Sequence, residues 1–406
     1  MQAQVEFTPE DRARLESALS RALLVAPKAR SVDKGLFFQI IALRDSPESA
    51  LEELRELLEV VRKVPILDLF NHAHQHALGR RKEVDFLFLV GWLVSRGQQV
   101  GSEHAVADLR RYLNAETLDL TEVLVIDGFE LENTICFGEY QLVPWKSLST
   151  TDTKWDVTER STYGDSFPSA AIVRRHEIKR IHAHPWNSPA QSIPISIETA
   201  LDVLRCVTVV CRAGIRLLHH WFEPPDWAPW AVSVNNFGID STTLALPVAL
   251  SADLVPKIQH CVLRFENSYE STRARLRVPI DRLNRSFLAG LRFVDQAIEL
   301  GVALESLYAP VKLPKRIACT VSKRAAHFLG GPPDVRCETA AILRDVYDLR
   351  SRAVHAGRFD ADGGPKMWSD PNHVMEVLRE GQRVVAQSLM KVIEDGEPKW
   401  EDFDIA

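Results

Sequence analysis

The sequence predicts a mainly helical protein with a smaller β-containing segment in its middle, an α+β fold. Apolar residues recur at helical spacing through most of residues 1–118 and 278–396. Between them, residues 119–277 contain short runs rich in Val, Ile, Phe and Tyr, separated by turn signals. We therefore expect a helical N-terminal region, a mixed β/α middle region, a C-terminal up-and-down four-helix bundle, and an acidic tail at 397–406.

Chain length and charge limit the possible functions. At 406 residues the chain has room for two or three domains. The net charge of −6 is not that of a generic polyanion-binding protein. Residues 281–360, however, carry 13 Lys and Arg against 9 Asp and Glu, whereas the residues after 360 carry 5 against 10. The locally basic block suits a phosphate-bearing partner, although an ordinary mixed-charge surface explains it equally well.

The cysteines and the apolar runs indicate a cytoplasmic protein without a membrane span. The six cysteines are scattered and form no C-x-x-C pair, which argues against a zinc ribbon and fits reduced thiols. The polar first residues lack the order of a signal peptide. The longest apolar run, 86–94, is far shorter than the roughly 20 residues that cross a bilayer.

In the N-terminal region, four helices are expected. Thr8 and Pro9 open one that runs to residue 24, and Ser46 and Pro47 open another with its leucines on one face. A buried helix is expected over 84–94 and a shorter one over 102–113. His72 and His76 would share a helical face, but no carboxylate or cysteine completes a site, so we expect helix histidines and no metal.

In the middle region, strands are expected over 123–126, 129–137, 140–145 and 171–181, and helices over 198–222 and 252–275. The last of these strands is basic, with Arg174 and Arg175, and Trp186 follows it. Such residues can contact nucleic acid through phosphate pairing and stacking. The alternative, which we favour, is an exposed strand whose charges prevent edge-to-edge aggregation.

The C-terminal region is expected to contain helices over 282–308, 313–329, 335–356 and 372–394. The third is amphipathic, and Gly357 is a candidate C-cap. Arg350 and His355 lie in its last turns, roughly 140° apart at about 100° per residue. They can converge through the length of the Arg side chain, through fraying of the helix end, or through a second copy of the helix. A cation beside an imidazole is a minimal set for cleaving a phosphodiester.

These residues resemble a known family. The segment from Arg350 to His355 resembles the R-x(4–6)-H motif of HEPN domains. Arg175 with His182 and Arg212 with His219 have compatible spacing, so the helical context must distinguish the motif. The flanking segments 294–298, 303–308 and 347–357 resemble the C-terminal HEPN domain of ApeA-type anti-phage proteins. The resemblance covers roughly residues 278–396.

The resemblance implies a metal-independent endoribonuclease with no cofactor. His355 would act as general base or acid and Arg350 would stabilise the phosphate. The ribose 2′-hydroxyl would attack, leaving a 2′,3′-cyclic phosphate, so DNA would resist. The family implies a homodimer formed through the C-terminal bundle. It also implies a phage-defence or abortive-infection effector, a toxin whose N-terminal region senses a phage-derived trigger.

Four further residues are candidates around this pair. Asp295 and Glu305 lie ten residues apart, close to one helical face, and either can orient the motif or pair with structural arginines; for Asp295 we favour the latter. Arg352 is a candidate contact to RNA phosphate. Ser351 stands where many ribonuclease members of the family carry Asn, Asp or His. It favours the alternative function, a non-catalytic HEPN module for dimerisation or RNA binding.

Overall fold

The structure is a computed structural model of the chain. It describes residues 7–27, 35–71, 74–77, 80–149, 151, 153–154, 157–158, 168–179, 195–230, 232, 234–237, 247–288, 291–309, 317–359 and 366–403.

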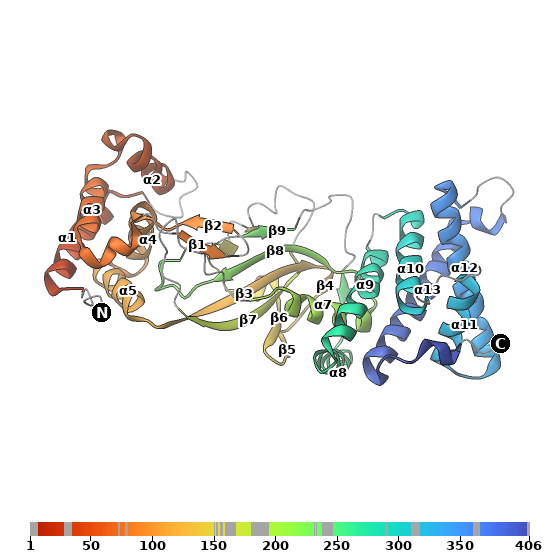
Figure 1. Cartoon of the computed structure of the whole chain (residues 1–406). Coiled ribbons are helices and arrows are strands. Elements are labelled where there is room, and N and C mark those ends of the chain that lie inside the picture. Colours follow the sequence, from red (N-terminus) through yellow and green to blue (C-terminus); the bar gives the residue numbers. More distant parts are fainter. Residues whose placement is uncertain are drawn as a thin grey trace.

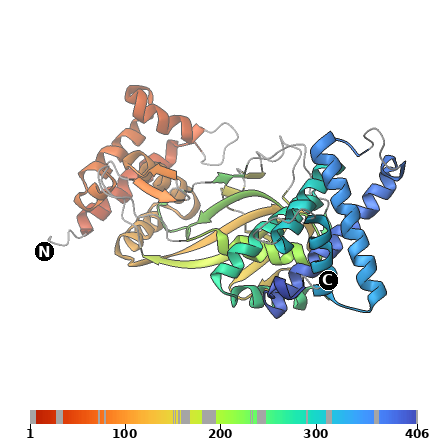
Figure 2. The same ribbon diagram turned by 45° about the vertical axis from the view of Figure 1, so that its right-hand side comes forward.

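The molecule is elongated, with helices at both ends and a sheet between them (Figures 1 and 2). The predicted fold class is confirmed at this level, because the described residues are mostly helical and the central sheet is small and antiparallel. No helix in the described part of the chain is both long enough and apolar enough to cross a bilayer.

The N-terminal end is a cluster of helices around its own core. Its elements are α1 (Pro9–Val25), α2 (Gly35–Asp45), η1 (Pro47–Ser49), α3 (Glu52–Lys63), η2 (Pro65–Phe70), α4 (Phe86–Val100) and α5 (Ser102–Asn114). The Thr8 side chain accepts a hydrogen bond from the Asp11 N–H at 3.1 Å, which confirms the predicted N-cap of α1. Pro47 opens only a 3₁₀ turn, because Ala50 is extended and α3 begins at Glu52.

The histidine-rich segment is a strand, so the expected helix there is wrong. Strand β1 (His74–Ala77) pairs antiparallel with β2 (Arg80–Glu83) in a two-stranded sheet. His72 lies outside the described residues.

The central sheet has six strands in the order β5-β6-β7-β3-β8-β9, and every neighbouring pair is antiparallel. Its strands are β3 (Thr117–Asp127), β5 (Ile135–Phe137), β6 (Tyr140–Pro144), β7 (Ala170–Lys179), β8 (Arg216–Glu223) and β9 (Asn235–Asn236). A separate parallel pair joins β4 (Phe129–Glu130) to β10 (Val248–Ala249).

One face of β3 contributes to two hydrophobic cores. Leu118 and Leu120 belong to the core of the N-terminal helices. Leu124 and Ile126 belong to a second core that continues through α7 (Glu198–Cys211) into the C-terminal helices. Glu122 lies between the two pairs on the same face, because side chains alternate along a strand.

The helix expected over 198–222 is wrong in its second half. Helix α7 ends at Cys211, Arg212 takes a left-handed conformation, and β8 follows. Strand β8 pairs with β3 and β9 and is buried on both faces. The sequence of β8, RLLHHWFE, shows no two-residue alternation of apolar and polar side chains, so its periodicity does not assign it to a strand.

The C-terminal end contains α8 (Val255–Glu266), α9 (Glu270–Phe287), α10 (Phe293–Tyr308), α11 (Ile317–Leu329), α12 (Pro333–Ala356), η4 (Lys366–Ser369), α13 (Pro371–Asp395) and η5 (Trp400–Phe403). The single helices expected over 252–275 and 282–308 are both interrupted. Leu288 and Arg292 are extended, so α9 and α10 are separate helices that pack on each other.

Helices α10 to α13 pack on one another and share their core with α7, α8 and α9. Helix α9 continues across the boundary expected between residues 277 and 278. In the expected acidic tail, Trp400 is buried and packs edge-on against Tyr308 and Phe328. The first residues of the tail therefore contribute to the core of this end.

Candidate functional site

Helix α12 presents the predicted motif at its C-terminal end. Leu343, Val346, Leu349 and Ala353 are buried and hold one face of the helix against α10, α11 and α13. Gly357 is left-handed at φ 65°, and its N–H donates to the carbonyl of Ala353 at 3.1 Å. The predicted C-cap is therefore confirmed, and α12 stays helical through His355.

Arg350 is positioned by a glycine on the neighbouring helix. A Cβ atom at Gly301 of α10 would overlap the Cγ of Arg350 and lie 3.1 Å from its Cβ. Only a residue without a side chain lets the stem of Arg350 cross α10 this closely.

The guanidinium of Arg350 is paired with Glu305, as the sequence allowed. Its Nη2 lies 3.2 Å from Oε1 of Glu305, and about a quarter of each side chain is exposed. The Nε of Arg350 and the hydroxyl of Tyr347 are buried and have no hydrogen-bond partner in the described structure. Burial and the nearby Glu305 carboxylate raise the pKa of Tyr347, so it stays a neutral phenol. The exposed N–H groups of the Arg350 guanidinium can bind an anion.

His355 is exposed and makes no hydrogen bond or ion pair within the described residues. Five residues of regular helix separate its direction from that of Arg350 by roughly 140°. Since α12 does not fray before Ala356, that route to convergence is absent from this structure. The length of Arg350 and a second copy of the helix remain as ways to bring the two groups together.

Of the other candidates, Arg352 is engaged within its own helix. Its Nε donates to Oδ2 of Asp348 at 3.0 Å, and the indole of Trp368 donates to the same oxygen at 2.8 Å. Trp368 in turn stacks on His373 of α13, with ring centroids 5.3 Å apart. Ser351 is exposed beside this group. The arrangement ties η4 and the start of α13 to the motif.

Asp295 lies away from the motif. It is in the first turn of α10 and pairs with Arg292, whose Nε is 3.1 Å from Oδ2. Ten residues of helix, about 15 Å, separate it from Glu305. Asp295 therefore forms an ion pair with a structural arginine, which is the alternative favoured from the sequence.

The basic strand β7 also has structural partners. Arg174 donates to Glu139, with its Nε at 3.1 Å, and lies over the ring of Tyr140 at 4.9 Å. Strand β7 is not an edge strand, because it pairs with β3 along its length and with β6 over Ala170–Arg174, so the expectation of an exposed edge is wrong for Arg174. His182 and Trp186, which were named as candidates above, lie outside the described residues.

Sequence reasoning missed a buried polar cluster on the sheet. Glu122 of β3 lies between His176 of β7 and His220 of β8, with N–O distances of 2.8 and 3.0 Å. Burial alone would raise the pKa of Glu122, but the hydrogen bonds and charges of His220 and His176 together lower it. Only the strand register brings the three residues together, and no sequence spacing reports that register.

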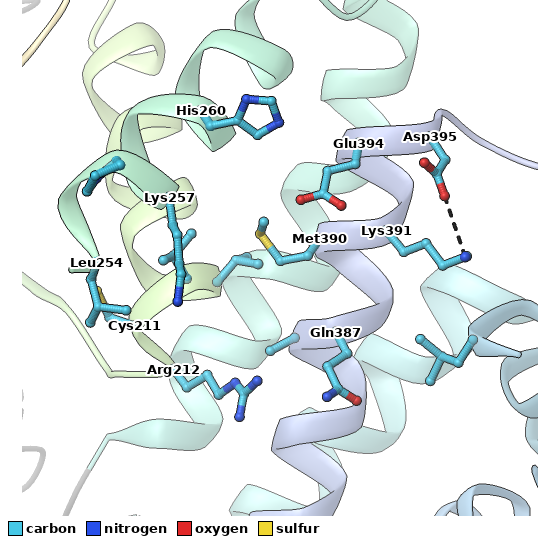
Figure 3. A pocket seen from close by; sticks show the side chains of 15 residues that line it. Cys211, Arg212, Leu254, Lys257, His260, Gln387, Met390, Lys391, Glu394 and Asp395 are labelled. Atoms are coloured by element: carbon cyan, nitrogen blue, oxygen red, sulfur yellow. Dashed lines mark ion pairs between the residues drawn. The ribbon is translucent and has the colours of Figure 1, made fainter. Parts of the chain in front are cut away.

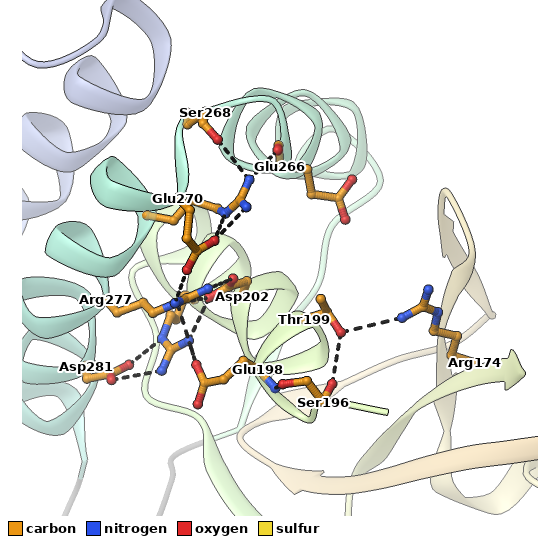
Figure 4. Close-up of polar contacts among 12 residues, drawn as sticks. Arg174, Ser196, Glu198, Thr199, Asp202, Glu266, Ser268, Glu270, Arg277 and Asp281 are labelled. Atoms are coloured by element: carbon orange, nitrogen blue, oxygen red, sulfur yellow. Dashed lines mark hydrogen bonds and ion pairs between the residues drawn. The ribbon is translucent and has the colours of Figure 1, made fainter. Parts of the chain in front are cut away.

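A second missed network joins α7 to α9 (Figure 4). Asp202 accepts from Arg205 at 2.6 Å and from Arg277 at 2.8 Å. Arg205 also reaches Asp281, and Arg277 reaches Glu270. This network is a structural clamp, because its charges are paired with one another.

Among the described residues, no group of three or more His, Cys, Asp or Glu is arranged to hold a metal ion. No family model matches the chain, and no curated protein or solved structure matches it either.

Proposed function

We propose that the chain is a metal-independent endoribonuclease of the HEPN type, with Arg350 and His355 as its catalytic pair. The observation that carries the proposal is the end of α12. There a partly exposed guanidinium, held by Glu305 and Gly301, and an exposed imidazole lie within one and a half helical turns. The helices α10 to α13 would be the up-and-down HEPN bundle. The biological role would be that of a phage-defence effector whose N-terminal region senses a trigger.

The proposed reaction uses the nucleophile that RNA itself carries. The ribose 2′-oxygen attacks the adjacent phosphorus while its proton passes to a base, and the bond to the 5′-oxygen breaks as that oxygen gains a proton. His355 serves one of these proton transfers. Arg350 stabilises the charge on the phosphate oxygens. The products are a 2′,3′-cyclic phosphate and a 5′-hydroxyl.

Glu305 fits this scheme as a positioning residue. Without substrate it balances the charge of Arg350 at 3.2 Å, and the exposed face of the guanidinium stays open to a phosphate. When the phosphate enters, Arg350 can bridge the two anions without moving its stem.

Dimer formation through the same end is part of the proposal. Val354, Met367 and Met375 are large apolar residues with 40 to 50% of their surface exposed, and they lie on α12, η4 and α13 next to the motif. Exposed Met and apolar residues of this kind are typical of the core of a protein interface. A twofold interface there would bring two motifs into one groove.

A non-catalytic HEPN module remains the alternative. Two observations favour it: the ion pair that already engages Arg350, and Ser351 next to it. Such a module would bind RNA or dimerise without cutting.

The proposal is tested by incubating labelled RNA with the protein in excess EDTA. We expect cleavage, with ends that resist a phosphatase unable to open cyclic phosphates, and no cleavage of the matching DNA. Bound but uncut RNA would support the alternative. Cleavage that requires added magnesium, or ends that lose their phosphate directly, would contradict the proposed chemistry.

A further inference from the structure

A cleft of about 930 Å³ lies at the other end of α13 from the motif (Figure 3). It is formed by the end of α7, the start of α8 and the last turns of α13. Gln387, at its edge, follows His373 by 14 residues, which is about 21 Å of helix. The cleft is therefore separate from the proposed catalytic site.

The inner surface of the cleft is apolar. The residues that form it share small or flexible hydrophobic side chains: Val209, Leu254, Leu329, Ala386 and Met390. The unbranched side chain of Met390 can adapt to the shape of a ligand. This surface suits the body of a small organic molecule.

Two cations at one end of the cleft are not neutralised by ion pairs. Arg212 and Lys257 are exposed and make no ion pair within the described residues. The charge of Lys257 does contribute, after a hydrogen bond from Ser251, to lowering the pKa of the exposed Asp253. Lys391 differs, because it pairs with Asp395 at 3.5 Å. The free cations therefore lie at the α7 and α8 side of the cleft.

The backbone at Arg212 is unusual. It is the only residue other than glycine with a positive φ in the described part of the chain, at 52°. A left-handed conformation is unfavourable for a residue that has a side chain. Figure 3 shows the Arg212 and Gln387 side chains on the same side of the cleft.

Gln387 has a defined orientation for recognising an anion. Its Oε1 accepts a hydrogen bond from Arg383 at 3.0 Å, which leaves its amide NH₂ free to donate. Glu394 lies seven residues further along α13, about 10 Å away, and also lines the cleft (Figure 3). The cleft thus has donors at one end and an acceptor at the other.

We propose that this cleft binds a small organic phosphate. The phosphate lies between Arg212 and Lys257 and accepts from Gln387, the body covers the apolar surface, and Glu394 accepts from a donor on the far side of the ligand. A phosphate monoester carries about −1.5 to −2 charges at pH 7, which two cations balance. The planar guanidinium can bind two of its oxygens at once.

The test is calorimetric titration of the full-length protein with inorganic phosphate, octyl phosphate and adenosine 5′-monophosphate. We expect at least one ester to bind at least tenfold more tightly than inorganic phosphate. Whichever ester binds identifies the body as alkyl or nucleoside. RNA cleavage is not a readout, so this result does not depend on the proposed ribonuclease activity.

Matched variants locate the binding. Arg212→Gly keeps the left-handed backbone while removing the guanidinium, and Lys257→Ala removes the second cation; each is expected to weaken ester binding about tenfold. Arg344→Ala and Lys323→Ala, both at exposed positions elsewhere, should leave it unchanged. Absence of binding by both esters, equal affinity for inorganic phosphate, or binding unaffected by the Arg212 and Lys257 variants would overturn the proposal.

Discussion

At the scale of single residues, the two motif side chains can be removed with little cost to folding. His355 is exposed and Arg350 is partly exposed near a helix end, so each alanine variant should lose roughly 1 kcal/mol of stability or less. We expect both to abolish RNA cleavage. His327→Ala and Arg344→Ala remove exposed residues of the same types and should keep full activity. A folded His355→Ala protein that cuts RNA normally would exclude the catalytic assignment.

Gly301 tests whether the placement of Arg350 matters. In Gly301→Ala the new methyl group would overlap the stem of Arg350, so we expect a loss of about 1–3 kcal/mol and reduced cleavage. Gly91→Ala is the matched control, since its nearest neighbour would be at 3.7 Å. There we expect a gain of up to about 1 kcal/mol. Thermal unfolding and cleavage assays on both variants distinguish the outcomes, and equal behaviour would contradict the role of Gly301.

Protonation of Glu122 makes the free energy of unfolding depend on pH in the acid range. Its pKa in the folded protein is lowered, so its contribution is present above the unfolded value of about 4.3 and is lost as the pH falls through the folded value. The stability difference between the wild type and Glu122→Gln should therefore narrow as the pH falls below about 5. Urea unfolding across this range measures it, and a constant difference would show that Glu122 is not the titrating group.

The sequence revealed candidate residues better than it revealed their partners. Arg350, His355 and Glu305 were found because their helical context is local, and Glu305 does meet Arg350 in the structure. The pairing of Glu122 with His176 and His220 depends on the strand register, which residues distant in the chain determine.

At the scale of elements, helix α12 and the strands β3, β6 and β7 were predicted, whereas strand β8 was not. Helix α12 was expected over 335–356 and runs over Pro333–Ala356, because its apolar face has a regular period and Gly357 ends it. Strand β8 was taken for helix because both of its faces are buried. Its actual neighbours are strands that lie about a hundred and about seventeen residues away.

The clamp between α7 and α9 is expected to stabilise the centre of the molecule. Asp202 is buried and pairs with Arg205 and Arg277, so Asp202→Ala removes one carboxylate partner from each arginine. We expect a loss of about 3–5 kcal/mol in chemical unfolding. Glu270→Ala removes an exposed partner of Arg277 and should cost much less than Asp202→Ala. Similar losses in the two variants would show that burial of Asp202 is not what matters.

At the scale of the whole molecule, the geometry of α12 bears on where a complete site would form. Arg350 and His355 project from different sides of α12, because the helix stays regular between them. Val354, one residue from His355, is half exposed. If two copies pair through this surface, Arg350 of one copy can meet His355 of the other.

Mixing two inactive variants tests this arrangement. A dimer has two sites. If each site takes Arg350 from one copy and His355 from the other, a heterodimer of Arg350→Ala with His355→Ala has one intact site and one site that lacks both residues. If each site lies within one copy, neither site of the heterodimer is intact. Random exchange makes half of the dimers mixed, so about a quarter of wild-type cleavage should return. Light scattering should show a dimer, and Val354→Glu should yield a folded, inactive monomer that abolishes the rescue. A fully active monomer would exclude the dimeric site, and a mixture without activity, from dimers shown to exchange, would place Arg350 and His355 in one copy.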